Sequence, residues 1–190
     1  MKKTIMISAL CAALVGCAST DEAKTSDVAT VAPESVTLGG MTNEAAADAL
    51  LAALLKKNYP ATKVSPTRVG VQFDKSQFVL QPSINPDGID RILMNRFYAV
   101  HPQMVGSKEL LVLIGTLNHK LNFAKFTLRE KGNVIQVQGA ATFVNTIDLE
   151  EIRRFMLWTD DGLHQVGKSL PEGSEELIKP IPIMKNPESA

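Results

Sequence analysis

Three histidines, two cysteines and the adjacent acids at 150–151 and 160–161 are the side chains best suited to chemistry in this chain. Only Asp160 and His164, one turn apart on a predicted helix, have a spacing typical of metal ligands. A third ligand has no neighbour in the sequence, so a solvated helix surface explains the pair better. The adjacent acids at 150–151 and 160–161 point about 100° apart on a helix, so neither pair faces one substrate. We expect these acids to be solvated.

Motifs of the common enzyme classes are missing from the sequence. It contains no Gly-x-Ser-x-Gly turn, Walker loop, His-Glu-x-x-His or Cys-x-x-Cys. We therefore expect no catalytic residue, no metal and no cofactor. An enzyme whose site assembles from residues far apart in sequence stays open as the least favoured alternative.

The composition indicates an ordinary globular protein. Of 190 residues, 45% are apolar and 21% are charged, with 20 basic and 20 acidic side chains. These values exclude a collagen-like, disulfide-framework or wholly disordered chain. A formal charge of zero provides no field to attract phosphate backbones, so we expect no nucleic-acid partner.

The first residues have the order of a bacterial export signal. Lys2 and Lys3 precede an apolar stretch at 4–15, which is too short to span a bilayer because a spanning helix needs roughly 20 apolar residues. Polar sequence follows from Ser19 onward. We interpret residues 1–16 as a signal peptide.

The end of this stretch resembles the lipobox of bacterial lipoproteins, on the residues Leu14, Val15, Gly16 and Cys17. The resemblance implies that the Cys17 thiol takes a diacylglycerol, that cleavage precedes it, and that its new amine is acylated, commonly by palmitate. A thiol is required because sulfur is the nucleophile that accepts the lipid. Ala18, in place of Asp, resembles lipoproteins sorted to the outer membrane. We expect a lipid-anchored protein at the periplasmic face of that membrane.

Periodicity predicts one domain between a tether and a tail. Residues 17–41 contain the lipidated cysteine and a flexible tether, 42–168 form the domain, and 169–190 form an irregular tail that contains four prolines. Apolar spacing predicts helices that begin near Thr42, Ser107 and Asp148, the last with an Asp capping box and an end at Gly167. Alternation predicts a hairpin at 69–80 and strands at 122–130 and 133–143.

Residues 89–100 fit both a helical stripe and a strand, and their aromatic and branched content favours the strand. The resulting order is α-β-β-β-α-β-β-α. It predicts an α+β fold with a mainly antiparallel sheet whose helices cover one face.

The segment at 110–126 resembles the central helix and following strand of YbjN-type domains, which share the type III secretion chaperone-like fold. The resemblance extends over roughly 43–167 and is clearest from 110 to 158. It implies the same order of elements, a habit of forming homodimers, and a role in binding proteins. It implies no catalytic residues.

Three function classes follow from these observations. We favour a lipid-anchored protein-binding or scaffolding module with an envelope protein as partner; Arg153, Arg154 and Trp158 form a candidate partner surface. The two arginines are also explained by a plain exposed face, and Trp158 is either the edge of the core or an interface anchor. A carrier of an apolar ligand, lipid or peptide, is the alternative, ahead of an enzyme with a dispersed site.

Overall fold

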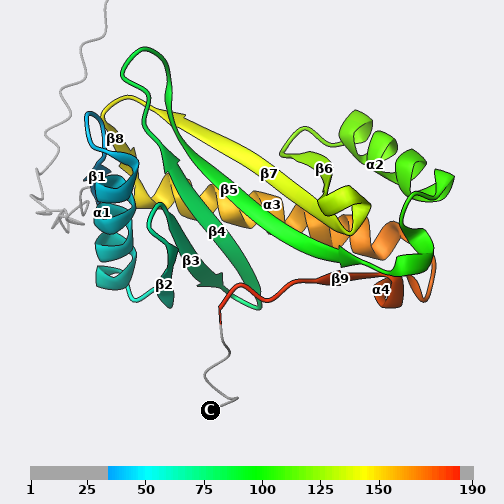
Figure 1. Cartoon of the computed structure of the whole chain (residues 1–190). Coiled ribbons are helices and arrows are strands. Elements are labelled where there is room, and N and C mark those ends of the chain that lie inside the picture. The colour runs from blue at the N-terminus through cyan, green and yellow to red at the C-terminus, as the bar shows by residue number, and fades with distance from the viewer. Residues whose placement is uncertain (1–33, 185–190) are drawn as a thin grey trace, which may run out of the picture. The chain divides into compact units, whose positions relative to one another are not determined.

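The computed structural model describes residues 34–184 (Figure 1). The signal peptide, the lipobox with Cys17 and most of the tether lie outside the described residues, so these interpretations remain predictions. None of the helices within 34–184 combines the length and the apolar character needed to cross a membrane.

A seven-stranded sheet with only antiparallel pairs forms the body of the fold (Figure 1). Six strands follow the order β2 (Ala61–Ser65), β3 (Arg68–Phe73), β4 (Ser76–Ser83), β5 (Asp90–Val100), β7 (Val134–Phe143) and β6 (Lys125–Arg129). The seventh, β9 (Ile178–Pro180), pairs with the end of β5 that β4 does not reach. A separate two-stranded sheet joins β1 (Ser35–Thr37) to β8 (Thr146–Asp148). The predicted α+β class with a mainly antiparallel sheet is confirmed.

Four α-helices accompany the sheet: α1 (Asn43–Lys56), α2 (Lys108–Lys120), α3 (Leu149–Ser169) and the short α4 (Ser174–Leu177). Thr42 and Ser107 are the N-caps of α1 and α2, as the sequence predicts. Each hydroxyl accepts a hydrogen bond from the backbone N–H three residues further along the chain. Single turns of 3-10 helix, η1 (Pro102–Met104) and η2 (Glu130–Gly132), complete the elements.

The three long helices cover one face of the sheet, as the order of elements predicts. Along β5, Ile92 and Met94 point to this face, and they are buried together with residues of α1 and α3. A second buried cluster places Leu110 of α2 against Phe126 of β6 and Ile135 of β7. The helices therefore form one layer and the sheet the other.

The opposite face of the sheet is largely polar. Gln136 and Gln138 both donate to the Asn95 Oδ1 atom, at 2.7 and 2.8 Å, and Asn95 is buried. The backbone N–H groups of Ile183 and Met184 donate to the Gln77 side chain, so the C-terminal segment is fastened to β4. These bonds satisfy polar groups that no helix covers.

The ends of α3 differ from the prediction. Asp148 is the N-cap, but its side chain makes no capping bond, and its Oδ1 atom is buried without a partner among the described residues. The helix continues through Gly167 to Ser169 and ends where Leu170 precedes Pro171. A residue before proline is pushed out of helical geometry, which explains this later end.

The flanking segments also contain more structure than the sequence predicts. β1 lies within the predicted tether, and α4 and β9 lie within the predicted irregular tail. Pro180 fits there because it is the last residue of a three-residue strand that pairs with β5 alone.

Candidate functional site

The edge of the sheet is open where β6 ends and β7 continues. β6 pairs with residues 134–138 of β7, whereas residues 139–143 of β7 pair only with β5 within the part of the chain that the structure describes. This edge contains Gly139, Ala140, Ala141, Thr142 and Phe143, none of them charged. Natural proteins usually protect such edges with charges, prolines or bulges.

The register shows which backbone groups point outward. In an antiparallel ladder, alternate residues direct both their N–H and C=O groups to the same neighbour. At the end of the β5–β7 ladder, the Val100 N–H donates to the Asn133 carbonyl at 2.9 Å. Alternation then directs Ala141 toward β5, and Ala140 and Thr142 toward the open edge. No described residue supplies a backbone partner to Ala140 or Thr142 on that side.

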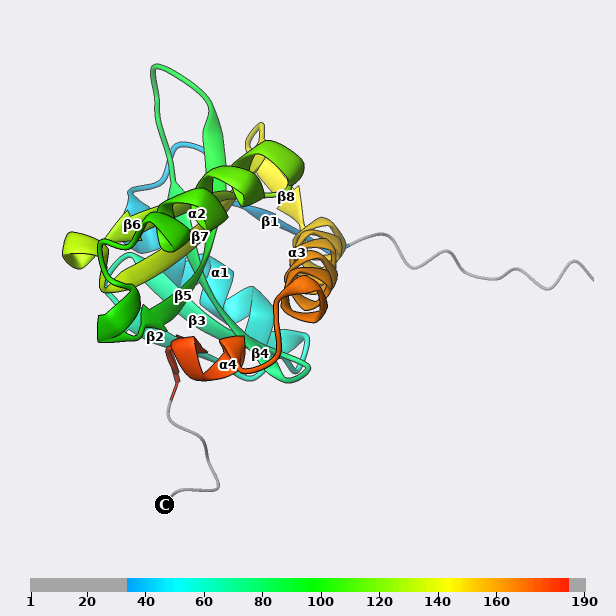
Figure 2. The ribbon, with the colours of Figure 1, turned by 90° about the vertical axis from the view of Figure 1, so that its right-hand side faces the viewer.

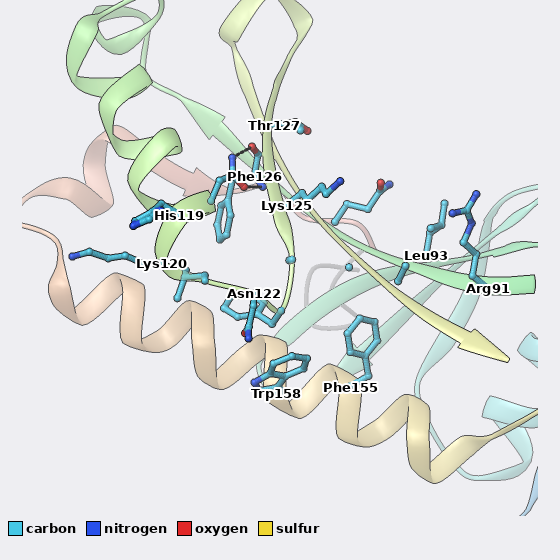
Figure 3. A pocket seen from close by; sticks show the side chains of 17 residues that line it. Arg91, Leu93, His119, Lys120, Asn122, Lys125, Phe126, Thr127, Phe155 and Trp158 are labelled. Atoms are coloured by element: carbon cyan, nitrogen blue, oxygen red, sulfur yellow. Dashed lines mark hydrogen bonds between the residues drawn. The ribbon is translucent and has the colours of Figure 1, made fainter. Parts of the chain in front are cut away.

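A cleft of about 940 Å³ adjoins this edge. Its walls come from β5, β7, α3 and the segment from the end of α2 into β6. Figure 3 shows Phe155 and Trp158 projecting into it from α3. Trp158 is 51% exposed and meets the Phe123 ring edge-on, with centroids 6.0 Å apart.

The segment that connects α2 to β6 is held by Asn118. Its side-chain amide donates to the Phe126 carbonyl, and its Oδ1 accepts from the Phe126 N–H, each at 2.8 Å (Figure 3). This pair of bonds imitates one rung of a sheet ladder. It positions His119 and Lys120 at the end of α2 and Lys125 at the start of β6 along the cleft.

The charged residues in the lining of the cleft are all basic. Arg91 from β5, Lys120 and Lys125 line it together with His119, and no acidic residue does. None of the three cations has an ion-pair partner among residues 34–184. The combination of aromatic rings and unpaired cations suits an anionic ligand with apolar groups.

Of the predicted partner residues, the structure brings only Trp158 to this cleft. Arg153 donates to both carboxylate oxygens of Glu150, at 2.7 and 2.9 Å, and Arg154 donates to Glu150 at 3.2 Å. The hydrogen bonds from Arg153 and, to a smaller extent, Arg154 lower the pKa of Glu150 to about 2. Both arginines form ion pairs with Glu150 on α3. The cations that line the cleft are Arg91, Lys120 and Lys125.

Two glycines allow α3 to lie close to β7 and the connecting segment. A Cβ at Gly139 would collide with the Phe155 ring, and one at Gly162 would collide with the Phe123 ring. Both glycines are buried at the contact. The close approach of α3 therefore depends on these positions having no side chain.

We predict opposite effects of alanine at two glycines of α3. Gly167→Ala, with open space around the new Cβ, gains helix propensity and stabilises the fold by about 1 kcal/mol. Gly162→Ala displaces the Phe123 ring and destabilises the fold by about 1–3 kcal/mol. Urea unfolding of the two variants measures the difference, and equal stabilities would contradict the predicted packing.

Asp160 does not belong to a solvated surface, so that interpretation is wrong for this residue. Its side chain is 9% exposed and accepts hydrogen bonds from the Ser76 hydroxyl and from Arg96 Nη1, the latter at 3.0 Å. The Arg96 guanidinium lies over the rings of Phe78 and Tyr98, 5.3 and 5.5 Å from their centroids.

The groups around Asp160 are joined in one polar network. His164 lies at the rim of this network, with Nδ1 3.4 Å from Asp160 Oδ2. The Ser76 hydroxyl donates to the Asp160 carboxylate, which also accepts from Arg96, and not to an imidazole. Residues 34–184 contain no cluster of three or more side chains arranged to hold a metal ion. The network joins α3 to β4 and β5.

In comparisons with known proteins, no family model and no curated protein matches this chain. The fold and the cleft define a class only: an α+β domain with an aromatic, cationic cleft at an open sheet edge.

Proposed function

We propose that this protein is a lipid-anchored envelope lipoprotein at the periplasmic face of the outer membrane, and that it binds other proteins without catalysing a reaction. Its binding site is the cleft beside the open edge of β7, and its ligand is an extended, acidic segment of an envelope protein. The observation that carries this proposal is the edge of β7 at 139–143, which pairs only with β5 among residues 34–184, next to Trp158 and three cations that form no ion pair within the same residues.

The edge provides the backbone part of such recognition. An extended segment that continues the line of β6 would pair with the outward N–H and C=O groups of Ala140 and Thr142. Backbone pairing of this kind accepts many sequences, so selectivity must come from the walls of the cleft. Trp158 and Phe155 offer apolar contact, and Arg91, Lys120 and Lys125 select acidic side chains.

A direct binding test is available because Trp158 is the only tryptophan in the chain. The probes are two octapeptides, one alternating glutamate and valine and the other alternating lysine and valine. We expect the glutamate peptide to shift the Trp158 emission saturably and the lysine peptide to bind at least about 10-fold more weakly, since it repels the cations. Equal responses, or none, would contradict the proposal.

Thr142→Pro is predicted to weaken binding of the glutamate peptide by about 10-fold. Proline removes the outward N–H, and a loss of about 1.4 kcal/mol is near the net value of one hydrogen bond. The fold tolerates it because proline fits an edge strand whose N–H points outward. Peptide titration followed by Trp158 fluorescence measures the effect.

Ala141→Pro is the matched control for this prediction. Its N–H points toward β5, so the substitution is expected to lower the thermal midpoint of unfolding. If Thr142→Pro also unfolds, peptides with N-methyl groups at alternate residues test the same backbone bonds on the wild-type protein. Undiminished binding of these peptides would exclude strand pairing.

Homodimer formation, which the resemblance to YbjN-type domains implies, would compete for the same edge. Pairing two copies along β7 would bring the cations Arg91, Lys120 and Lys125 of both copies together, so charge favours an acidic partner over a second copy. Light scattering at micromolar concentration distinguishes the two occupants. A dimer that Thr142→Pro dissociates would assign the edge to self-association.

A further inference from the structure

Two adjoining compartments lie between α3 and the sheet, on the face that the helices cover. One, of about 190 Å³, is lined by α2, α3, α4 and the sheet, and the other, an open depression of about 410 Å³, lies between α3 and the start of β4. Tyr98, Leu163 and Gly167 line both. Figure 2 shows α2, α3 and α4 around this end of the sheet.

The first compartment is apolar. Leu117 of α2, Val137 of β7 and Val166 of α3 are among its lining residues, and Glu175 is the only charged one. Its volume has room for about six groups of the size of a water molecule, which occupies about 30 Å³ in the liquid. A methylene group is of similar size, so the compartment fits a short alkyl chain.

The second compartment is cationic. Lys75 and Lys168 line it from opposite sides, together with Arg96 and His164. Asp160 lies beneath it but is already bonded to Arg96 and Ser76. No acidic residue lines the compartment itself.

Tyr98 stands at the junction of the two compartments. Burial of its ring raises the pKa of the phenol, so the hydroxyl is a proton donor at neutral pH. No described group forms a hydrogen bond with this hydroxyl, and the Tyr98 side chain lines both compartments. A donor in this place suits the head of an anionic molecule whose tail enters the apolar side.

From this juxtaposition we propose that the protein binds a single-chain amphiphile with a carboxylate head, a medium-chain fatty acid. The alkyl chain occupies the apolar compartment beside Leu117 and Val137. The carboxylate lies at the junction, where it accepts from Tyr98 and faces Lys75 and Lys168. This site does not involve the open edge of β7, and it shares only Phe126 with the lining of the peptide cleft.

Calorimetric titration with octanoate, octanol and octylammonium tests the site. We expect saturable binding of octanoate below its micelle concentration, at least 10-fold weaker binding of octanol, and none of octylammonium, because only octanoate satisfies the cations. Octanol binding as tightly as octanoate would overturn the role of the cationic compartment. Absence of saturable octanoate binding would overturn the proposal altogether.

Matched glycine variants locate the bound chain. Gly167→Leu places a side chain in open space at the junction and is expected to reduce octanoate affinity at least 10-fold. Gly115→Leu on α2, whose new Cβ also meets nothing and which lines neither compartment, is expected to leave it unchanged. Equal affinities of the two variants would overturn the assigned position.

Charge variants locate the head. Removing both cations, Lys75→Gln with Lys168→Gln, should weaken octanoate at least 10-fold and leave octanol unaffected, whereas Lys108→Gln on α2 should change neither. Thr142→Pro should bind octanoate normally. This last result separates the fatty-acid site from the peptide cleft, so that the failure of one proposal is distinguishable from the failure of the other.

Discussion

Replacing Asp160 by leucine is expected to lower the free energy of unfolding by about 3–5 kcal/mol, because the change leaves the Arg96 cation without its partner. The Arg96 side chain is only 14% exposed, so water compensates little for the lost carboxylate. The Ser76 hydroxyl loses its acceptor in the same substitution. Such a loss is a large part of the 5–15 kcal/mol by which domains are typically stable.

Two further variants make the Asp160 result specific. Asp161→Leu, at the exposed neighbouring position of α3, is expected to change stability by no more than about 0.5 kcal/mol. The double variant Arg96→Met with Asp160→Leu is expected to recover much of the loss, since no buried charge is left unpaired. Urea unfolding measures the stability of all three variants. An Asp160→Leu variant as stable as Asp161→Leu would contradict the buried ion pair.

The partners of Asp160 explain why the sequence alone pointed to a solvated position. Arg96 lies 64 residues and Ser76 lies 84 residues away along the chain. Spacing along the helix indicates only His164, four residues further on, whose Nδ1 atom lies 3.4 Å from Asp160 at the exposed rim of the network. Burying a charge costs little free energy only when an opposite charge or hydrogen-bond partners contact it. Here those partners come from distant parts of the sequence, and spacing within a helix contains no information about them.

The strand at 90–100 shows how local pattern and tertiary context interact. Ile92, Leu93, Arg96 and Phe97 fit a helical stripe in the sequence. In the structure, β5 is a central strand whose even positions face the helices, while Leu93 and Phe97 lie half-buried on the other face. A strand with apolar residues on both faces imitates a helix, and the branched and aromatic content correctly indicated the strand.

The open edge of β7 could not be predicted from the sequence, because it exists only where β6 is shorter than its pattern predicts. The pattern predicts a strand over 122–130, nearly as long as its partner. In the structure β6 begins only at Lys125, since Phe123 leaves the ladder and packs edge-on against Phe126 and Trp158. The side chain of Phe123 thus exposes the end of β7, and no periodicity distinguishes it from a strand residue.

The second prediction with a large expected effect concerns the proposed lipid anchor at Cys17. Each buried methylene contributes about 0.8 kcal/mol, and a single acyl chain holds a protein only marginally at a membrane. Three chains on the Cys17 residue would fix the protein essentially irreversibly. The sequence at 42–168 contains neither a polybasic run nor an apolar stretch long enough to span a bilayer, so we expect the proposed anchor to dominate membrane attachment.

Cys17→Ala is therefore expected to remove all incorporation of a fatty-acid label and to release the protein from the membrane fraction. The chain provides its own control in Cys11, which lies inside the apolar stretch of the proposed signal peptide and would be removed by the proposed cleavage. Cys11→Ala should retain both label and membrane location, because only the thiol at the cleavage site accepts the lipid. Gel fluorography after labelling cells with a fatty-acid probe reads out both variants. Label that persists in Cys17→Ala, or disappears in Cys11→Ala, would mean that the anchor is not at Cys17.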